Sequence, residues 1–140
     1  MEIRKIGVIG AGQMGAGIAQ VAAQAGYGVV LRDLETSFIE RGLNTIQRSL
    51  GKLLEKGRLD QSAHDAALAR IVTTTHLADL KDCDLVIEAI VEHEPSKLEL
   101  FHELDQTVKA EAILGSNNSS IHITRLASAT RRPERFIGMH

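Results

Sequence analysis

The sequence predicts an α/β fold in which helices cover a parallel β-sheet, and three observations lead to this prediction. Short apolar runs without strict alternation recur along the 140 residues, as expected for strands that are buried on both faces. Helical patterns separate these runs, which is typical of βαβ units. A hydrophobic fraction of 44% beside 24% charged residues is that of an ordinary globular domain. We therefore expect one doubly wound domain over residues 1–140.

Six runs rich in leucine and β-branched residues are the expected strands. Their ranges are 5–10, 28–31, 70–73, 84–90, 112–116 and 135–139. A helix is expected over residues 13–25, where Met14, Ile18 and Val21 form one apolar stripe and Gly26 ends the pattern. A later helix is expected over 94–109, with Pro95 at its first turn. Its apolar face comprises Leu98, Phe101, Leu104 and Val108.

Between the second and third strands, the sequence predicts two helices instead of one. Ser37 and Glu40 fit a capping box, after which an apolar helical stripe continues to about Lys56. A break at Gly57 follows, and Asp60 is expected to cap a second helix. The two helices would form a hairpin extension. The residues leave open whether this hairpin is a surface elaboration or contacts a substrate.

Composition and charge exclude several classes of function. A formal net charge of −2 leaves no basic excess for nucleic acid or an acidic membrane surface. The longest apolar stretches are about six residues, whereas a bilayer span needs roughly twenty. The single cysteine, Cys83, excludes an internal disulfide framework, and the six histidines lack metal-ligand spacing. No leader-like segment precedes the first strand, so we expect a cytoplasmic protein without bound metal.

A glycine-rich sequence, GAGQMG, lies between the first expected strand and the first helix and fits the pattern G-x-G-x-x-G. In this pattern Gly10 permits a tight turn, Gly12 lets a pyrophosphate approach the backbone, and Gly15 allows close packing of helix and strand. The N–H groups around Gln13 and Met14 would face the phosphates at the positive end of the helix dipole. The sequence therefore predicts dinucleotide binding in a Rossmann-type domain. A structural turn or another phosphate ligand is the alternative.

An acidic residue, Asp33, ends the second expected strand. A carboxylate at this place accepts hydrogen bonds from the adenosine ribose and repels a 2′-phosphate, which favours NAD over NADP. Its neighbour Arg32 is a good phosphate partner and favours the opposite choice. Because adjacent strand residues point to opposite faces, only one of the two faces the ribose. We expect this residue to be Asp33 and the cofactor to be NAD.

Polar residues follow the fourth and fifth expected strands, in the sequences EAIVE at 88–92 and SNNSS at 116–120. Ligands of open α/β sheets bind beyond the carboxyl ends of the strands, so both groups are placed for a binding site. The second sequence alone is equally typical of a polar turn. The sequence FIGMH at 136–140 adds a histidine after the last strand.

Together these motifs resemble the NAD-binding domain of the L-3-hydroxyacyl-CoA dehydrogenase family. The resemblance covers the whole chain in order, through GAGQMGAGIAQVAAQAG, VVLRD, the helical insertion, DLVIEAIVE, SNNSSIHIT and RPERFIGMH. Several independent motifs at these spacings are specific to the family. Related crystallin-like and sugar-acid dehydrogenases share much of the pattern, so the resemblance indicates the family more firmly than the substrate.

The resemblance implies an oxidoreductase of fatty acid β-oxidation that transfers a hydride between C3 of an L-3-hydroxyacyl-CoA and NAD. His140 would be the catalytic base, a role that suits imidazole because it titrates near physiological pH. Ser119 would hydrogen-bond the C3 oxygen of the substrate. The other implied contacts are Asn117 at the nicotinamide, Glu92 and Lys97 at the nicotinamide ribose, and Ser49 and Lys56 toward coenzyme A.

Parts of the family's machinery do not occur in this sequence. In the family a downstream glutamate orients the histidine, an asparagine helps to hold the substrate, and a helical second domain completes the acyl pocket and the dimer contact. We therefore expect the chain to be the cofactor half of a longer, homodimeric enzyme and nearly inactive by itself. A sugar-acid dehydrogenase and a non-catalytic dinucleotide-binding module are the alternative interpretations.

Overall fold

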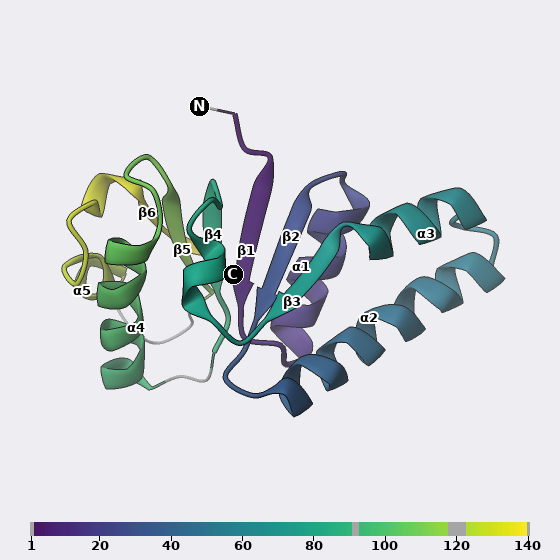
Figure 1. Ribbon diagram of the computed structural model, residues 1–140, viewed down its shortest axis with the longest axis horizontal. Coiled ribbons are helices and arrows are strands. Elements are labelled where there is room, and N and C mark those ends of the chain that lie inside the picture. Colours follow the sequence, from purple (N-terminus) through teal and green to yellow (C-terminus); the bar gives the residue numbers. More distant parts are fainter. Residues whose placement is uncertain (1, 91–92, 118–122, 140) are drawn as a thin grey trace.

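The computed structural model describes residues 2–90, 93–117 and 123–139. Its centre is a six-stranded parallel sheet with the order β3-β2-β1-β4-β5-β6 (Figure 1). The strands are β1 (Lys5–Ile9), β2 (Gly28–Arg32), β3 (Ile71–Thr74), β4 (Leu85–Glu88), β5 (Ile113–Asn117) and β6 (Phe136–Met139). The chain runs outward from β1 to β3 and then returns to β4 beside β1. This reversal of strand order confirms the predicted doubly wound α/β fold, and open sheets bind ligands beside such a reversal.

Helices cover the two halves of the sheet separately (Figure 1). The helices α1 (Gln13–Gln24), α2 (Thr36–Glu55) and α3 (Gln61–Ala69) accompany strands β1 to β3. The helices α4 (Glu94–Thr107) and α5 (Ile123–Ala127) accompany strands β4 to β6. Two short 3₁₀ turns, η1 (Leu77–Leu80) and η2 (Pro133–Arg135), complete the connections. Within the described residues no helix is long and apolar enough to cross a lipid bilayer.

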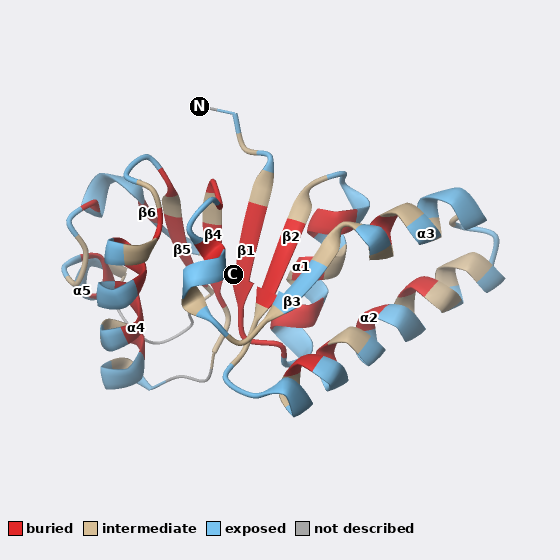
Figure 2. Ribbon diagram, viewed as in Figure 1, coloured by how far each residue is buried: buried red, intermediate tan, exposed pale blue. Residues whose placement is uncertain are grey.

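Two hydrophobic clusters lie on opposite faces of the sheet, because successive strand residues point in opposite directions. In β1, Val8 joins the cluster that contains the alanines of α1. Its neighbour Ile9 joins the cluster that contains Phe101 and Leu104 of α4. Figure 2 shows the resulting pattern, with the middle of the sheet buried and the outer turns of the helices exposed. The sheet is therefore covered on both faces, as the apolar runs predicted.

The apolar stripe of α1 is not the face of the helix that packs on the sheet. Met14 is 57% exposed and Val21 is 67% exposed. The buried residues of α1 are small: Gly15, Ala16, Ala19, Ala22 and Ala23. The distance between packed elements depends on the side chains at the contact, and small residues let this helix approach the sheet closely. The close approach of α1 to the sheet therefore determines which face of the helix is buried, and the larger apolar side chains lie on its exposed face.

The helices α2 and α3 form the hairpin that was predicted between β2 and β3. The 20 residues of α2 make a helix about 30 Å long, at about 1.5 Å per residue. Gly57 has a φ of +69° at the predicted break, and Asp60 Oδ1 accepts a backbone N–H from the first turn of α3 at 2.7 Å. The predicted capping box is wrong. The helix α2 begins at Thr36, and Glu35 occupies the N-cap without a side-chain hydrogen bond.

A buried carboxylate, Asp84, joins strands β1 and β4 at their amino ends. Its Oδ2 accepts the N–H groups of Arg4 and Lys5 at 2.8 and 3.0 Å, and its Oδ1 pairs with the Lys109 ammonium. The hydrogen bond from Lys109 is the main cause that lowers the pKa of Asp84 from 3.8 to about 2, and the two backbone N–H groups lower it further. The charged carboxylate is therefore a stabilising contact of the folded state.

Replacing Asp84 with asparagine is expected to lower the free energy of unfolding by about 2 kcal/mol at pH 7. The pKa is lower in the folded state, so this stabilisation is complete above about pH 5 and disappears as the pH falls toward 2. Urea unfolding of both proteins measures the difference, which should shrink to less than half near about pH 2.5. A difference that does not change with pH would contradict this origin of the effect.

Candidate functional site

The glycine loop joins β1 to α1 at the carboxyl end of the sheet, where the sequence predicted it. Gly10 has a φ of +104°, which favours glycine, and a Cβ on Gly15 would lie 1.6 Å from the Gly10 carbonyl oxygen. Gly12 differs from both, since its φ is −72° and a Cβ there would meet nothing within 4 Å. Gly10 and Gly15 are therefore required by the protein's own packing. Gly12 leaves open space beside the backbone, as the approach of a pyrophosphate requires.

Among the described residues, no side chain caps the start of α1. Gly12 is the N-cap without a side-chain hydrogen bond, and the first turn contains no acidic residue. Gln13 and Met14 are the first two residues of the helix. The first N–H groups of a helix lack intrahelical acceptors and, together with the helix dipole, they attract an anion. The described residues therefore fit a phosphate group at this place.

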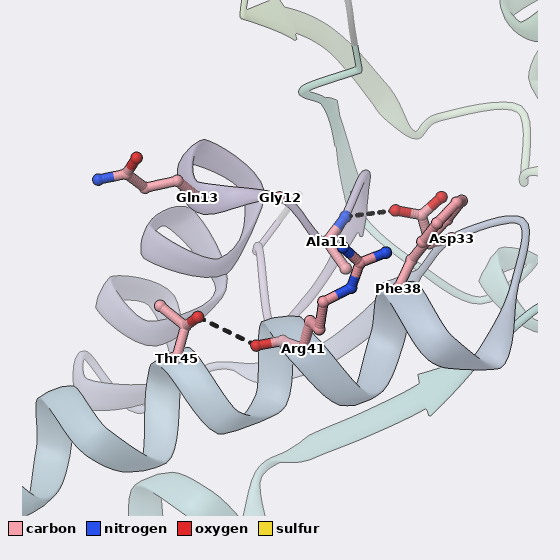
Figure 3. Close-up of a pocket in the computed structure, with 7 residues that line it drawn as sticks. All are labelled: Ala11, Gly12, Gln13, Asp33, Phe38, Arg41 and Thr45. Atoms are coloured by element: carbon pink, nitrogen blue, oxygen red, sulfur yellow. Dashed lines mark hydrogen bonds between the residues drawn. The ribbon is translucent and has the colours of Figure 1, made fainter.

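Two adjoining cavities lie beside the glycine loop. The first has a volume of about 440 Å³ and lies between the loop and the first turns of α2 (Figure 3). The second has a volume of about 570 Å³ and extends from the loop to α4, past Ile90 and Leu100. Gly12, Asp33 and Phe38 belong to both cavities. Together they form a continuous cleft beside the reversal of strand order, with room for an extended ligand.

The carboxylate of Asp33 lies where the two cavities meet. Its Oδ2 accepts the N–H of Ala11 at 2.7 Å, and its Oδ1 accepts the N–H of Leu34 at 2.7 Å. The neighbouring Arg32 also borders the second cavity, but its Nε donates to the carbonyl oxygen of Thr75 at 3.2 Å. Asp33 thus borders the glycine loop directly, whereas Arg32 is held by the loop that follows β3. Contact of Asp33 with a ribose stays a prediction.

A buried ion pair, which sequence reasoning missed, lies at the carboxyl ends of β4 and β5. Glu88 and Lys97 are both 0% exposed, and Lys97 Nζ lies 3.1 Å from Glu88 Oε2. The same carboxylate accepts the N–H of Ile90 at 2.7 Å and the hydroxyl of Ser116 at 2.6 Å. Glu88 therefore joins β4, β5 and α4. The available signal was a glutamate at the end of an apolar strand, where a buried charge requires a partner.

Lys97 is one of the residues that the resemblance implies at the nicotinamide ribose. In the structure Lys97 is fully buried and pairs with Glu88. The structure therefore shows Lys97 as part of the interior that supports the strand ends. Its contact with the ribose stays a prediction.

Apart from Lys97, the residues predicted to contact the nicotinamide half of the cofactor or to act in catalysis come in the sequence at or just after the ends of three neighbouring strands. Glu88, Asn117 and Met139 are the last residues of β4, β5 and β6. These strands are adjacent and parallel, so their carboxyl ends share one edge of the sheet. Asn117 is partly buried there. The three remaining predicted residues follow these strand ends in the sequence and lie outside the described residues: Glu92, Ser119 and His140.

The two residues implied for coenzyme A, Ser49 and Lys56, belong to the second half of α2 and its end. Ser49 is partly buried, and Lys56 is exposed at the C-cap. The residue of α2 nearest to them that borders a cavity is Thr45. One helical turn separates it from Ser49, and about three turns separate it from Lys56. The described cavities therefore end before both residues, and a contact with coenzyme A stays a prediction.

Comparisons with known proteins agree with this geometry. The family model described as the NAD-binding domain of 3-hydroxyacyl-CoA dehydrogenase matches residues 5–140. A protein named probable 3-hydroxybutyryl-CoA dehydrogenase, from Deinococcus radiodurans, is 59% identical over 136 residues, which are 97% of this chain and 49% of the relative. The 3-hydroxybutyryl-CoA dehydrogenase of Bradyrhizobium diazoefficiens is 54% identical over 138 residues, 99% of this chain and 47% of the relative.

A solved structure extends the agreement to the backbone. The crystal structure of FadB2 from Mycobacterium tuberculosis matches 100% of this chain and 50% of its own chain, with a TM-score of 0.97 and 45% identity. The chain thus spans about half the length of the curated relatives that it matches. The chain belongs to the 3-hydroxyacyl-CoA dehydrogenase family, and it corresponds to the NAD-binding domain of the proteins in that family.

Proposed function

We propose that this chain is the cofactor-binding half of an enzyme that transfers a hydride between C3 of an L-3-hydroxyacyl-CoA, such as 3-hydroxybutyryl-CoA, and NAD. The observation that carries the proposal is the 59% identity to a probable 3-hydroxybutyryl-CoA dehydrogenase over 97% of the chain. The complete activity is proposed for a protein that also contains the other half of its relatives. By the same resemblance, this protein is a cytoplasmic homodimer that acts in fatty acid oxidation.

In this proposal the cleft holds the adenosine half of NAD. The diphosphate lies at the start of α1, beside Gly12, where the structure leaves open space. The adenosine ribose binds at Asp33, where the two cavities meet, and the adenine occupies the cavity toward α4. The nicotinamide half would then extend toward the carboxyl ends of β4, β5 and β6, and Asn117, the last residue of β5, would contact it.

The proposed chemistry is the oxidation of a secondary alcohol. NAD supplies the hydride acceptor when it is bound. Ser119 hydrogen-bonds the C3 oxygen, and His140 accepts the hydroxyl proton as the C–H bond at C3 breaks. Glu92 and Lys97 position the nicotinamide ribose, and Glu88 holds Lys97 in place. Ser49 and Lys56 interact with the phosphate-bearing part of coenzyme A.

We expect NADH to bind at least about ten times more tightly than NADPH, because Asp33 accepts ribose hydroxyls and repels a 2′-phosphate. Asp33→Asn should reduce this ratio by weakening NADH and strengthening NADPH. Arg32→Ala is the matched control, and it should leave the preference for NADH in place. Fluorescence titrations with both cofactors measure the ratio. Tighter binding of NADPH than of NADH to the unmodified chain would contradict the role of Asp33.

The substrate is tested with a protein in which this chain is joined to a second half like that of its relatives. Acetoacetyl-CoA and free acetoacetate are compared as oxidants of NADH, with kcat/KM as the measurement. The proposal predicts a much higher kcat/KM for acetoacetyl-CoA than for free acetoacetate. It also predicts that His140→Ala loses activity with both compounds. Equal rates with both compounds would refute the thioester and favour the sugar-acid type of substrate. Full activity of His140→Ala would refute the assigned base.

A further inference from the structure

The side chain of Arg41 extends from α2 toward the glycine loop, as Figure 3 shows. Arg41 borders the first cavity together with Ala11, Gly12 and Gln13, which are residues of the loop and of the start of α1. The guanidinium carbon lies 5.1 Å from the centre of the Phe38 ring, in a cation–π arrangement. The ring supports the guanidinium from one side and leaves its N–H donors available to the cavity.

The neighbouring Gly42 fixes the distance between Arg41 and the loop. Gly42 is buried, and a Cβ at this position would lie 2.6 Å from the Ala11 carbonyl oxygen and 2.9 Å from the Ala11 Cβ. Only a residue without a side chain lets α2 approach the loop so closely. Because Arg41 precedes Gly42 on a rigid helix, its side chain begins beside the loop. The close contact therefore places a cation opposite the start of α1.

The charged residues that border the two cavities indicate what Arg41 could bind. In the described part of the chain Arg41 forms no ion pair. The acidic residues that border the two cavities are Asp33, Glu99 and Glu103. Arg32, the other cation there, donates to the backbone at Thr75. Without Arg41, the charged residues that border the two cavities would be three carboxylates and the single guanidinium of Arg32. This negative excess disfavours a ligand that carries two phosphates.

We propose that Arg41 binds the diphosphate of NAD from the side opposite the first N–H groups of α1. The diphosphate would then lie between the positive end of a helix dipole and a guanidinium, which form charge-assisted hydrogen bonds with phosphate. The inference rests on NAD binding, which the family membership establishes, and is independent of the acyl-CoA substrate. Arg41 is thus a further cofactor-binding residue, which the motifs of the sequence did not single out.

The test compares three ligands with and without phosphate on the purified chain. Arg41→Ala should weaken NADH and ADP by about ten-fold each and change adenosine by less than about two-fold, because adenosine has no diphosphate. Arg41→Lys retains the positive charge but lacks the paired N–H donors of a guanidinium. Its affinity for NADH and ADP should lie between those of the wild type and of Arg41→Ala. The affinity for NADH should also depend less on salt in Arg41→Ala. Arg48→Ala is the control, since Arg48 is exposed on the same helix and borders neither cavity.

Several outcomes would overturn the inference. Unchanged NADH and ADP affinities in Arg41→Ala would show that the guanidinium does not contact the diphosphate. An equal loss for adenosine would assign the effect to the shape of the Phe38 surface. NADPH is titrated as a fourth ligand, and a loss of affinity confined to it would assign Arg41 to a 2′-phosphate. Each of these results leaves the proposed dehydrogenase reaction intact, because that reaction is tested separately with acetoacetyl-CoA.

Discussion

Gly12→Ala is expected to weaken NADH binding by about 100-fold while the free energy of unfolding changes by less than about 1 kcal/mol. The φ of −72° is accessible to alanine, and the added Cβ would meet no protein atom within 4 Å. The methyl group would instead occupy the space through which the diphosphate approaches the backbone. Fluorescence titration with NADH and urea unfolding measure the two quantities on the same samples.

Gly15→Ala is the matched comparison, and it should behave differently. Its Cβ would lie 1.6 Å from the Gly10 carbonyl oxygen, so the loop or α1 has to move. We expect a loss of stability of about 3 kcal/mol or more together with the loss of NADH binding. Wild-type affinity for NADH in Gly12→Ala would show that the diphosphate does not pass over Gly12.

Lys97→Met is expected to lower the free energy of unfolding by about 3 to 5 kcal/mol, because it leaves the Glu88 carboxylate buried without a cation. This would be a large share of the stability of a domain of this size. Both side chains are 0% exposed, so water cannot take the place of the ammonium. Urea unfolding at pH 7 measures the loss. Lys81→Met, at an exposed turn, is the control and should change stability by less than about 0.5 kcal/mol.

A second substitution separates the buried charge from the lost packing of Lys97. In the double variant Glu88→Gln with Lys97→Met, the uncompensated charge is absent, and stability should recover in part. If Lys97→Met alone stays within about 1 kcal/mol of the wild type, the pair does not carry the stability assigned to it.

The strands were predictable from the sequence because burial on both faces requires uninterrupted apolar runs. The predicted run at 28–31 and the observed β2 (Gly28–Arg32) differ by one residue. The packing face of α1 was not predictable from hydrophobicity. Its buried alanines and Gly15 are less hydrophobic than Met14 and Val21, and only the close approach to the sheet selects them.

The candidate site was predictable where local backbone conformation determines it. The glycine pattern and Asp33 lie on a single turn and strand end, so spacing alone brings them together. The pair of Glu88 and Lys97 depends on how α4 packs beneath β4, which no local pattern specifies. Arg41 resembles any exposed arginine of a helix until the contact of Gly42 with the loop is known.

The two backbone N–H groups that hold Asp33 have a further consequence for recognition. Each carboxylate oxygen accepts one backbone N–H, and these two hydrogen bonds fix the rotamer of Asp33 without any contact from a ligand. A carboxylate that is already held in one rotamer loses little conformational entropy when it binds a sugar, and this smaller loss favours tighter binding. If Asp33 binds the ribose as proposed, discrimination between two nucleotides that differ by one phosphate would follow from this fixed carboxylate and would need no closing movement.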